Sequence, residues 1–243
     1  MFVSPYYAEA LWKICKSRDL NVNTQLNLIR VDPLVRNAYF ERITGDNIDS
    51  SKQQITSIDG SIVCLNYDML HVTPPMSAAK FLSPLSTRNS NGFVAVNNQT
   101  LQHVKYRNIF SLGDCSSLPT SKTAAAIAAQ NYVLANNLSI EMGIDNNNND
   151  QRSQKFLHYN GYTSCPLLVG FNRCILAEFD YTLQPVETWW FDQRVPRFST
   201  FFMNTDLFPA LYWRALLNGR WPGPEMSNIR RWLNPKKNQN FGS

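Results

Sequence analysis

The stretch SLGDCSSLPTSKTAAAIAAQ, residues 111–130, decides how the rest of this sequence is interpreted. Its pattern is typical of a short apolar strand, a Gly-Asp turn and a helix. We expect Thr120 or Ser121 to cap the helix, which begins near Lys122 and ends near Leu138. This unit predicts an α/β fold in which the strand joins a parallel sheet.

The Asp of the turn has two possible tasks. The carboxylate of Asp114 can accept a hydrogen bond from a ribityl or ribose hydroxyl of a flavin, while Gly113 lets the backbone pass close to that ligand. The N-terminus of the next helix offers partial positive charge, which favours a reduced, anionic flavin. The alternative is that Asp114 only ties down the turn.

The phosphate end of a dinucleotide site needs a glycine-rich turn between a strand and a helix. The chain has ten glycines, and none of them form the pattern GxGxxG. The closest pair is Gly219 and Gly223. The sequence therefore carries at most one half of a dinucleotide site.

Charge is concentrated at the C-terminal end of the 243 residues. The net charge is +5, and residues 193–243 hold eight basic and two acidic side chains. Basic segments of this kind bind nucleic acid or acidic membrane surfaces. The three histidines are isolated and no zinc-ligand spacing or nucleic-acid motif occurs, so we expect neither metal nor nucleic acid as a partner.

The remaining pattern predicts further elements by residue range. We expect a helix over 5–18, strands over 22–31, 36–43, 61–72 and 92–96, a polar linker over 145–157, and a β-hairpin over 174–191 that turns at Gln184-Pro185. No run of 18 apolar residues occurs, so no simple membrane-spanning helix is expected.

The segment DLFPALYWRALL, residues 206–217, predicts an amphipathic helix. Its apolar face is formed by Leu207, Phe208, Leu211, Tyr212, Ala215 and Leu216. Trp213, Trp221 and Trp232 and the nearby arginines suit a helix that lies in the plane of a membrane interface. The alternative is a helix packed on the protein core.

Four segments together resemble sulfide:quinone oxidoreductases of the mitochondrial type: HVTPPMSAAK, LQHVKYRNIFSLGDCSSLPTSKTAAAIAAQ, YNGYTSCPLLVGFNRCILAEFDY and DLFPALYWRALLNGRWPGP. The resemblance covers about residues 5–235 and matches only the C-terminal half of that family's protein. Its specific feature is the joint presence of GDCSSLPTSKTAAA and GYTSCPL, which lie about fifty residues apart.

The resemblance implies a partial flavoprotein with two dinucleotide-binding domains, of the disulfide-reductase type, with a C-terminal β-hairpin and amphipathic helices. Residues 1–72 would be a remnant of a nicotinamide-like domain, and residues 73–144 the C-terminal part of the FAD-binding domain. After the linker over 145–157, residues 158–243 would form a redox-cysteine and membrane-associating region. The implied location is the mitochondrial inner membrane, as a peripheral protein.

The resemblance also implies the chemistry. Such a protein oxidises hydrogen sulfide to a persulfide with FAD and passes electrons to ubiquinone, and a small acceptor such as glutathione or sulfite removes the sulfur. Two redox cysteines carry that sulfur, and Cys165 of GYTSCP matches one of them. The partner cysteine and the glycine-rich FAD fingerprint belong to the family's first half.

The implied cofactor-binding residues are Gly113, Asp114, Lys122, Thr123 and Pro75. Lys122 and Thr123 would lie at the pyrimidine edge of the flavin, where a cation or N–H favours electron density on the ring. Pro75 would shape the crossing between the two domains near the flavin. The alternatives are that Lys122 is a solvated lysine and that Pro75 only ends a strand.

The five cysteines are odd in number and form no CxxC pair, which favours a reducing compartment. We expect Cys165 in an accessible turn, because its neighbours Tyr162, Thr163 and Ser164 are polar and Pro166 stiffens the backbone. Cys115 is expected to pack beneath the Gly-Asp turn. Cys15, Cys64 and Cys174 are expected to be structural.

Two other functions compete with this enzyme. The missing glycine fingerprint favours a non-catalytic, membrane-associated fragment or interaction protein. A relative that oxidises NADH would need a glycine-rich nicotinamide site, which is also missing. If strands of the parallel sheet are absent, apolar edges are exposed, and we expect poor solubility for the chain expressed alone.

Overall fold

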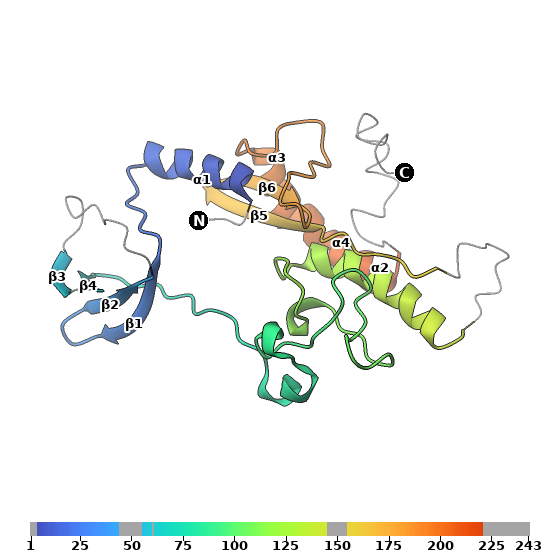
Figure 1. Cartoon of the computed structure of the whole chain (residues 1–243). Coiled ribbons are helices and arrows are strands. Elements are labelled where there is room, and N and C mark those ends of the chain that lie inside the picture. The colour runs from blue at the N-terminus through green and yellow to red at the C-terminus, as the bar shows by residue number, and fades with distance from the viewer. Residues whose placement is uncertain (1–3, 44–54, 60, 145–154, 221–243) are drawn as a thin grey trace. The chain divides into compact units, whose positions relative to one another are not determined.

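The computed structural model describes residues 4–43, 55–59, 61–144 and 155–220 (Figure 1). The chain divides into two compact units. The first comprises residues 11–76, and the second combines residues 2–10 with residues 77–243.

The first unit holds a four-stranded antiparallel sheet in the order β1-β2-β4-β3. Its strands are β1 (Leu26–Asp32), β2 (Asn37–Arg42), β3 (Ile55–Asp59) and β4 (Ile62–Asn66). The strands predicted over 22–31, 36–43 and 61–72 are confirmed as β1, β2 and a shorter β4. β3 was not predicted, because a five-residue segment after a polar stretch shows no clear alternation and becomes a strand by pairing with β4.

The second unit combines helices with one β-hairpin. The helix α1 (Pro5–Ser17) begins in this unit and confirms the helix predicted over 5–18. The hairpin consists of β5 (Thr163–Gly170) and β6 (Arg173–Phe179). The other helices are α2 (Ala124–Glu141), α3 (Phe198–Phe202) and α4 (Phe208–Arg214), with 3₁₀ turns at Lys80–Leu85, Arg88–Ser90, Gly113–Cys115 and Leu216–Asn218.

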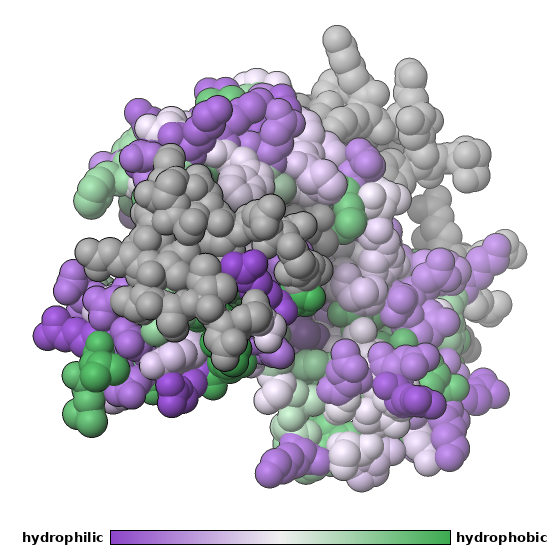
Figure 2. Space-filling model, turned by 60° about the vertical axis from the view of Figure 1, so that its left-hand side comes forward, coloured by the Kyte–Doolittle hydropathy of each residue, from purple (hydrophilic) through white to green (hydrophobic). Residues whose placement is uncertain are grey.

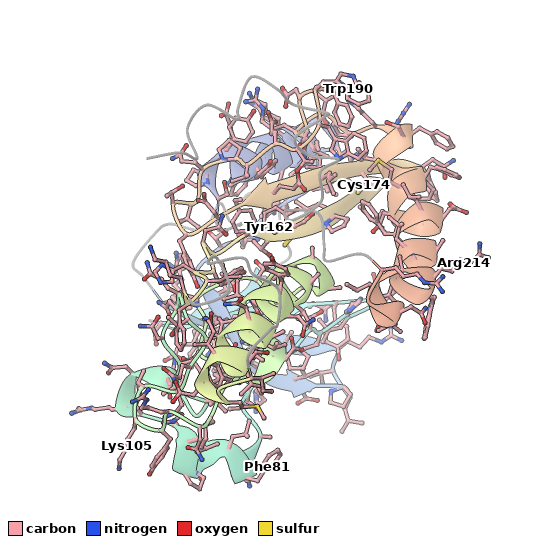
Figure 3. All side chains as sticks on the ribbon, turned by 90° about the vertical axis from the view of Figure 1, so that its right-hand side faces the viewer. Phe81, Lys105, Tyr162, Cys174, Trp190 and Arg214 are labelled. Atoms are coloured by element: carbon pink, nitrogen blue, oxygen red, sulfur yellow. The ribbon has the colours of Figure 1, made fainter. Side chains whose placement is uncertain are left out.

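The main hydrophobic core of the second unit lies between α2 and two long connecting segments. Its buried members are Val94, Val96, Leu101, Leu118, Ala129, Val133, Tyr159 and Tyr162. Figure 3 shows Tyr162 between the hairpin and α2. This core therefore joins the Gly-Asp segment, α2 and the entry to β5, which are the parts that carry the sequence motifs.

The strand predicted over 92–96 and the short apolar strand predicted before the Gly-Asp turn do not form a parallel sheet within the described residues. They make isolated bridges instead: Val94 pairs in parallel with Ser116, Val96 pairs antiparallel with His103, and Phe110 pairs antiparallel with Gln102. A ladder needs a neighbouring strand of matching length, and the described chain supplies only single contacts here. The predicted α/β pattern is thus present as mixed helix and strand with small antiparallel sheets.

The predicted β-hairpin has a different turn. The strand at 174–179 is confirmed as β6, but it pairs with the preceding β5 around Phe171 and Asn172, not with residues after Gln184. Asn172 has a positive φ of 55°, which suits such a tight turn. After β6 only one isolated bridge forms, between Phe179 and Pro185, because Pro185 has no N–H to extend a ladder.

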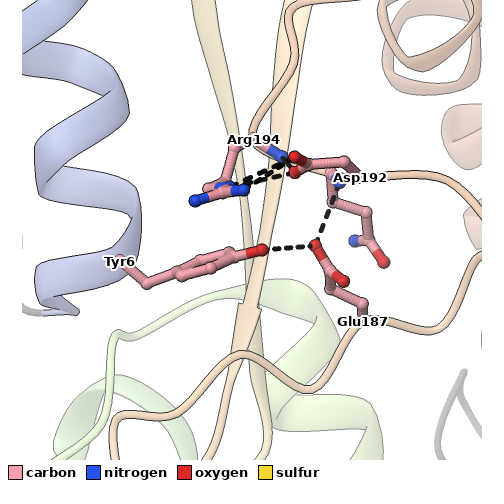
Figure 4. A network of polar contacts seen from close by, with 5 residues as sticks. Tyr6, Glu187, Asp192 and Arg194 are labelled. Carbon is pink, nitrogen blue, oxygen red and sulfur yellow. Dashed lines mark hydrogen bonds and ion pairs between the residues drawn. The ribbon is translucent and has the colours of Figure 1, made fainter.

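The loop after β6 is held against the first turn of α1. Tyr6 donates a hydrogen bond to Glu187 at 3.3 Å, and Arg194 lies over the Tyr6 ring at 4.2 Å (Figure 4). Arg194 also pairs with Asp192 at 2.9 Å. The first residues of the chain therefore brace the loop that carries Trp189 and Trp190.

The C-terminal helix is longer than predicted. Helical geometry runs from Phe198 through a π-helical turn (Met203–Leu207) to Arg214, whereas the prediction began at residue 206. Along it Phe198, Phe202, Trp213 and Leu217 are exposed. Of the predicted apolar face, Leu207 and Tyr212 are also exposed, and Phe208, Leu211, Ala215 and Leu216 are half-buried. Trp221, Trp232 and the arginines beyond 220 lie outside the described residues.

Exposed apolar side chains occur elsewhere as well. Figure 2 shows green hydrophobic side chains interrupting the purple hydrophilic surface on one face. In the described part of the chain, no helix has both the length and the hydrophobicity needed to cross a bilayer.

Candidate functional site

The Gly-Asp turn is closed by residues other than its Asp. Gly113 has a φ of +65°, in the left-handed region that glycine tolerates. Both the backbone N–H and the hydroxyl of Ser116 donate to the Gly113 carbonyl, at 3.2 and 2.7 Å. Asp114 is exposed, and its carboxylate makes no hydrogen bond or ion pair with any residue that the structure describes. Within the described residues, the hydrogen bonds that hold this turn come from Ser116, Gln130 and Lys122 and not from the Asp114 carboxylate.

Lys122 lies against the same turn. Its Nζ donates to the Ser116 carbonyl at 2.7 Å and to the Gly113 carbonyl at 3.3 Å, and it lies 4.7 Å from the centre of the Phe93 ring. Burial lowers the pKa of Lys122, and the nearby Asp114 and Cys115 oppose this shift. The alternative of a solvated lysine is wrong, because the ammonium group is half-buried and tied to the backbone.

The helix after the turn begins slightly later than predicted. Thr123, not Thr120 or Ser121, is the N-cap of α2, and its Oγ1 accepts a hydrogen bond from the Ala126 N–H at 3.3 Å. Thr123 has the extended backbone that an N-cap requires, with φ −123° and ψ 156°. The helix continues to Glu141, three residues past the predicted end.

Cys165 lies in β5, opposite Ala177 of β6. It is half-buried, and its neighbours Tyr162, Thr163 and Ser164 are buried, so the predicted accessible turn is wrong. Polarity misled the prediction, because these side chains satisfy their hydrogen bonds internally: the Tyr162 hydroxyl donates to Glu178 at 2.7 Å.

The environment of the Cys165 thiol combines two opposing effects. Burial raises the pKa of this thiol, while hydrogen bonds with Ser121 and Thr163 lower it. The hydroxyls of Thr163 and Thr123 lie 3.1 Å apart, and Thr163 also approaches the Ser121 carbonyl at 3.3 Å. The thiol is therefore placed beside the N-terminal end of α2.

The backbone before Cys165 depends on a glycine. Gly161 has a φ of +89°, and a Cβ there would meet the Tyr181 ring at 2.4 Å. The ring of Tyr181 packs on that of Tyr159 with centroids 5.7 Å apart. The glycine of the GYTSCP motif thus permits a close approach that fixes how the chain enters β5.

Five of the six predicted site residues lie in the second unit and are linked there. Gly113 and Asp114 lie in the turn, and Lys122 donates to the Gly113 carbonyl. Thr123 caps the adjoining helix, and Cys165 is joined to that cap through Thr163. The sixth residue, Pro75, belongs to the first unit. It lies in an extended segment after β4.

Sequence reasoning missed Thr163 and Gln130 as site residues. Thr163 is the first residue of β5, the strand that carries Cys165, and it is fully buried with its hydroxyl 3.1 Å from that of Thr123. Gln130 is buried in α2 and accepts a hydrogen bond from the Gly113 N–H at 2.8 Å. For Gln130, the available signal in the sequence was a polar side chain among the alanines of an apolar helix face.

The other cysteines have different environments. Cys115 is exposed, so the expectation that it packs beneath the turn is wrong; its sulfur lies 3.1 Å from the Ser111 hydroxyl. Cys64 and Cys174 are buried in strands, as predicted, and Cys15 is half-buried in α1. Burial raises the pKa of Cys174 to about 11. Within residues 4–220, as far as they are described, no three His, Cys, Asp or Glu side chains gather in a way that would hold a metal ion.

Three curated proteins that resemble this chain share one name. The chain is 46% identical over 218 residues to the mitochondrial sulfide:quinone oxidoreductase of Mus musculus, and these residues are 90% of this chain and 44% of that protein. The proteins of the same name from Dictyostelium discoideum and Schizosaccharomyces pombe are 39% and 37% identical, over 92% of this chain and 44% and 46% of theirs. The chain thus spans less than half the length of these relatives. No protein-family model matches it.

The fold also resembles that of a solved chain. It belongs to the cryo-EM structure of the Tetrahymena thermophila mitochondrial ATP synthase, an F1Fo composite tetramer. The TM-score is 0.66 at 24% identity, covering 88% of this chain and 46% of that chain. At this level of identity the likeness concerns the fold alone. The resemblance of this chain to sulfide:quinone oxidoreductases of the mitochondrial type, which the Gly-Asp and Cys165 motifs predicted, is confirmed for the part of those proteins that it spans.

Proposed function

We propose that this chain contributes one part of a sulfide:quinone oxidoreductase, which oxidises hydrogen sulfide to a persulfide and passes the electrons to ubiquinone. The observation that carries the proposal is the link between the Gly-Asp turn and Cys165 through the cap of α2. A flavin-facing turn and a sulfur-carrying residue must lie close together for electrons to pass between them.

The proposed cofactor is FAD, which would supply a two-electron acceptor when bound. The turn fits one end of such a group, because the Asp114 carboxylate is exposed and accepts no hydrogen bond from the described residues. Asp114 would accept a hydrogen bond from a ribityl hydroxyl. Lys122 would act as a fixed positive charge beneath the turn, and Thr123 would bring the N-terminal end of α2 to the flavin edge.

Cys165 would act as one of two cysteines that handle sulfur. In the proposed step hydrosulfide attacks the bond between the two sulfurs, leaving a persulfide on one cysteine and a thiolate on the other. The hydrogen bonds from Ser121 and Thr163 would favour the thiolate on Cys165. A small acceptor such as glutathione or sulfite would then remove the outer sulfur.

The domain assignment belongs to the same proposal. Residues 1–72 would be the remnant of a nicotinamide-like domain and residues 73–144 part of an FAD-binding domain, in a protein of the two-dinucleotide-binding-domain type. After the linker, residues 158–243 would carry the redox cysteine and the membrane-associating helices. The relatives' names support a mitochondrial location, and we propose peripheral attachment to the inner membrane.

The test is the visible absorption spectrum of the purified chain together with sulfide-dependent quinone reduction. The spectrum and the activity are measured for the chain alone. They are measured again after addition of a polypeptide that covers the part of the relatives that this chain does not match. Bound flavin and activity, lost in Cys165→Ala but kept in the control Cys115→Ala, would support the proposal. A colourless and inactive protein in both preparations would overturn it.

A non-catalytic, membrane-associated protein is the second candidate. The absence of a glycine-rich phosphate turn from the sequence and the exposed Phe198, Phe202, Trp213 and Leu217 favour it. It predicts vesicle binding without flavin. Flavin and quinone reduction in the same test would rule it out.

A further inference from the structure

A buried carboxamide lies between the two motifs of the site. Gln130 is 2% exposed in the middle of α2. Its Oε1 accepts the hydrogen bond from the Gly113 N–H at 2.8 Å, and its Nε2 donates to the Tyr159 hydroxyl at 3.3 Å. Because a backbone N–H can only donate, the carboxamide has one orientation that satisfies both neighbours. Rotation of the side chain would break both hydrogen bonds in a buried place.

The Tyr159 hydroxyl extends this connection. It donates its single proton to the Tyr162 carbonyl at 2.6 Å and therefore accepts from Gln130 through a lone pair. Tyr159 is itself 2% exposed. A continuous chain of hydrogen bonds thus runs from Gly113 through Gln130 and Tyr159 to Tyr162, three residues before Cys165.

Side-chain packing also holds the Gly-Asp turn against α2. A Cβ on Gly113 would meet the Ile127 side chain at 3.2 Å, so the turn already lies in contact with α2. Ile127 and Gln130 are neighbours on the helix surface, one turn apart. The turn is therefore pressed against one side chain of α2 and hydrogen-bonded to the next, in an interior where such bonds are strong.

We propose that Gln130 is the positioning residue that sets the Gly-Asp turn against the segment leading into Cys165. The inference rests on the proposed function, which gives Asp114 and Cys165 their roles. Gln130 touches neither a substrate nor a reacting atom and acts through Gly113 and Tyr159. It would keep a ligand held by Asp114 and a sulfur held by Cys165 at a fixed separation.

The test compares Gln130→Leu with Asn137→Leu. Asn137 is fully buried on the same helix and bonds the carbonyls of Thr100 and Leu157 and the Leu157 N–H, so it is a matched control. Hydrogen exchange at Gly113 and the alkylation rate of Cys165 are read peptide by peptide. Gln130→Leu is expected to speed Gly113 exchange about tenfold, the effect of losing one buried hydrogen bond, and to change Cys165 alkylation several-fold.

The control Asn137→Leu is expected to lower the melting temperature by a similar amount and to leave both readouts within about twofold of the wild type. Equal changes in both variants would mean general loosening of α2 and would overturn the inference.

Tyr159→Phe provides a second test, which stands even if Gln130→Leu does not fold. It keeps the Gly113–Gln130 hydrogen bond and removes the link to Tyr162, so Gly113 exchange should change little while Cys165 alkylation changes. In the double variant the effects on Cys165 should be non-additive, because both changes cut one chain. Unchanged Cys165 alkylation in Tyr159→Phe would contradict the inference. These readouts need neither flavin nor sulfide, so their failure is distinct from failure of the proposed function.

Discussion

The hydroxyls of Thr123 and Thr163 lie 3.1 Å apart, although forty residues separate them in the sequence. Thr123 already accepts the Ala126 N–H as the cap of α2, so its own proton is available for Thr163. Thr163 donates its own proton to the Ser121 carbonyl at 3.3 Å. The two threonines thus tie the start of β5 to the N-terminal end of α2. Burial raises the pKa of the Cys165 thiol, and the smaller opposing effect of hydrogen bonding with Ser121 and Thr163 lowers it.

Removal of the Thr163 hydroxyl should make Cys165 less reactive. In Thr163→Val the Cys165 thiol loses its hydrogen bonding with Thr163, so the pKa of Cys165 should rise further. Alkylation by iodoacetamide, followed across pH by mass spectrometry, would show a later midpoint for Cys165. Thr163→Ser should restore it, and the exposed Cys115 is an internal control. An unmoved Cys165 midpoint in Thr163→Val would refute the role of the hydroxyl.

Gly161 should not accept even a methyl group. In Gly161→Ala the new Cβ would meet the Tyr181 ring at 2.4 Å and its backbone nitrogen at 2.7 Å, at a φ of +89°. We expect a loss of about 2–4 kcal/mol in the free energy of unfolding, measured with denaturant. Gly143→Ala is the control, since its φ is +64° and nothing lies within 4 Å. It should lose only about 1 kcal/mol, and equal losses would contradict the packing argument.

The Glu178 side chain is buried, and hydrogen-bond donors surround its carboxylate. Its carboxylate accepts from the Tyr162 hydroxyl at 2.7 Å, from the Thr188 N–H at 2.9 Å and from Gln193 Nε2 at 2.9 Å. In Glu178→Gln an amide donor would face one of these donors, so we expect about 2–4 kcal/mol of destabilisation.

The matched control for this change is Glu141→Gln. Glu141 pairs at 3.0 Å with Arg107, whose side chain is largely exposed, and such pairs contribute less than about 1 kcal/mol. Chemical unfolding of both variants measures the difference. A Glu178→Gln protein as stable as Glu141→Gln would show that the buried carboxylate is dispensable.

The Asp192–Arg194 pair should make stability depend on acid. The hydrogen bond from Arg194 holds the pKa of Asp192 below its ordinary value of 3.8. A carboxyl group whose pKa is lowered in the folded state stabilises the fold above its unfolded pKa, and this contribution is lost as the pH falls through the folded pKa.

Wild type and Asp192→Asn should therefore differ in melting temperature above about pH 4 and converge below it. The effect will be small, since the pair is more than one-third exposed. Asp68→Asn, at an exposed pair with Arg36, is the control. A gap between wild type and Asp192→Asn that persists at the lowest pH would argue against this assignment.

The C-terminal helix should carry the membrane contact. Phe202 and Trp213 are 52% and 66% exposed on it, and Asp at either position should weaken binding to anionic lipid vesicles several-fold. Phe81→Asp is the control, because Phe81 is 80% exposed in the 3₁₀ turn at Lys80–Leu85, which is not part of this helix. Vesicle co-sedimentation measures binding. Equal loss in all three variants, or none in Phe202→Asp and Trp213→Asp, would exclude the helix as the contact.

Local patterns in the sequence determined the elements and the motifs. Helix α1, the first two strands and α2 follow from periodicity and capping, which act over a few neighbouring residues. The Gly-Asp turn and Cys165 were identified because the motifs GDCSSLPTSKTAAA and GYTSCPL occur together and resemble those of a known family. The same local reasoning placed the hairpin turn and the cap of α2 wrongly, since several nearby residues suited each role.

Only the tertiary structure decided what these residues contact. Polar neighbours suggested that Cys165 is accessible, but Tyr162 and Thr163 are buried because their hydroxyls find partners in β6 and at the start of α2. Gln130 and Gly113 meet for the same reason, through hydrogen bonds between segments distant in sequence. Such pairings depend on which segments share a core, and a local pattern of residues carries no information about that choice.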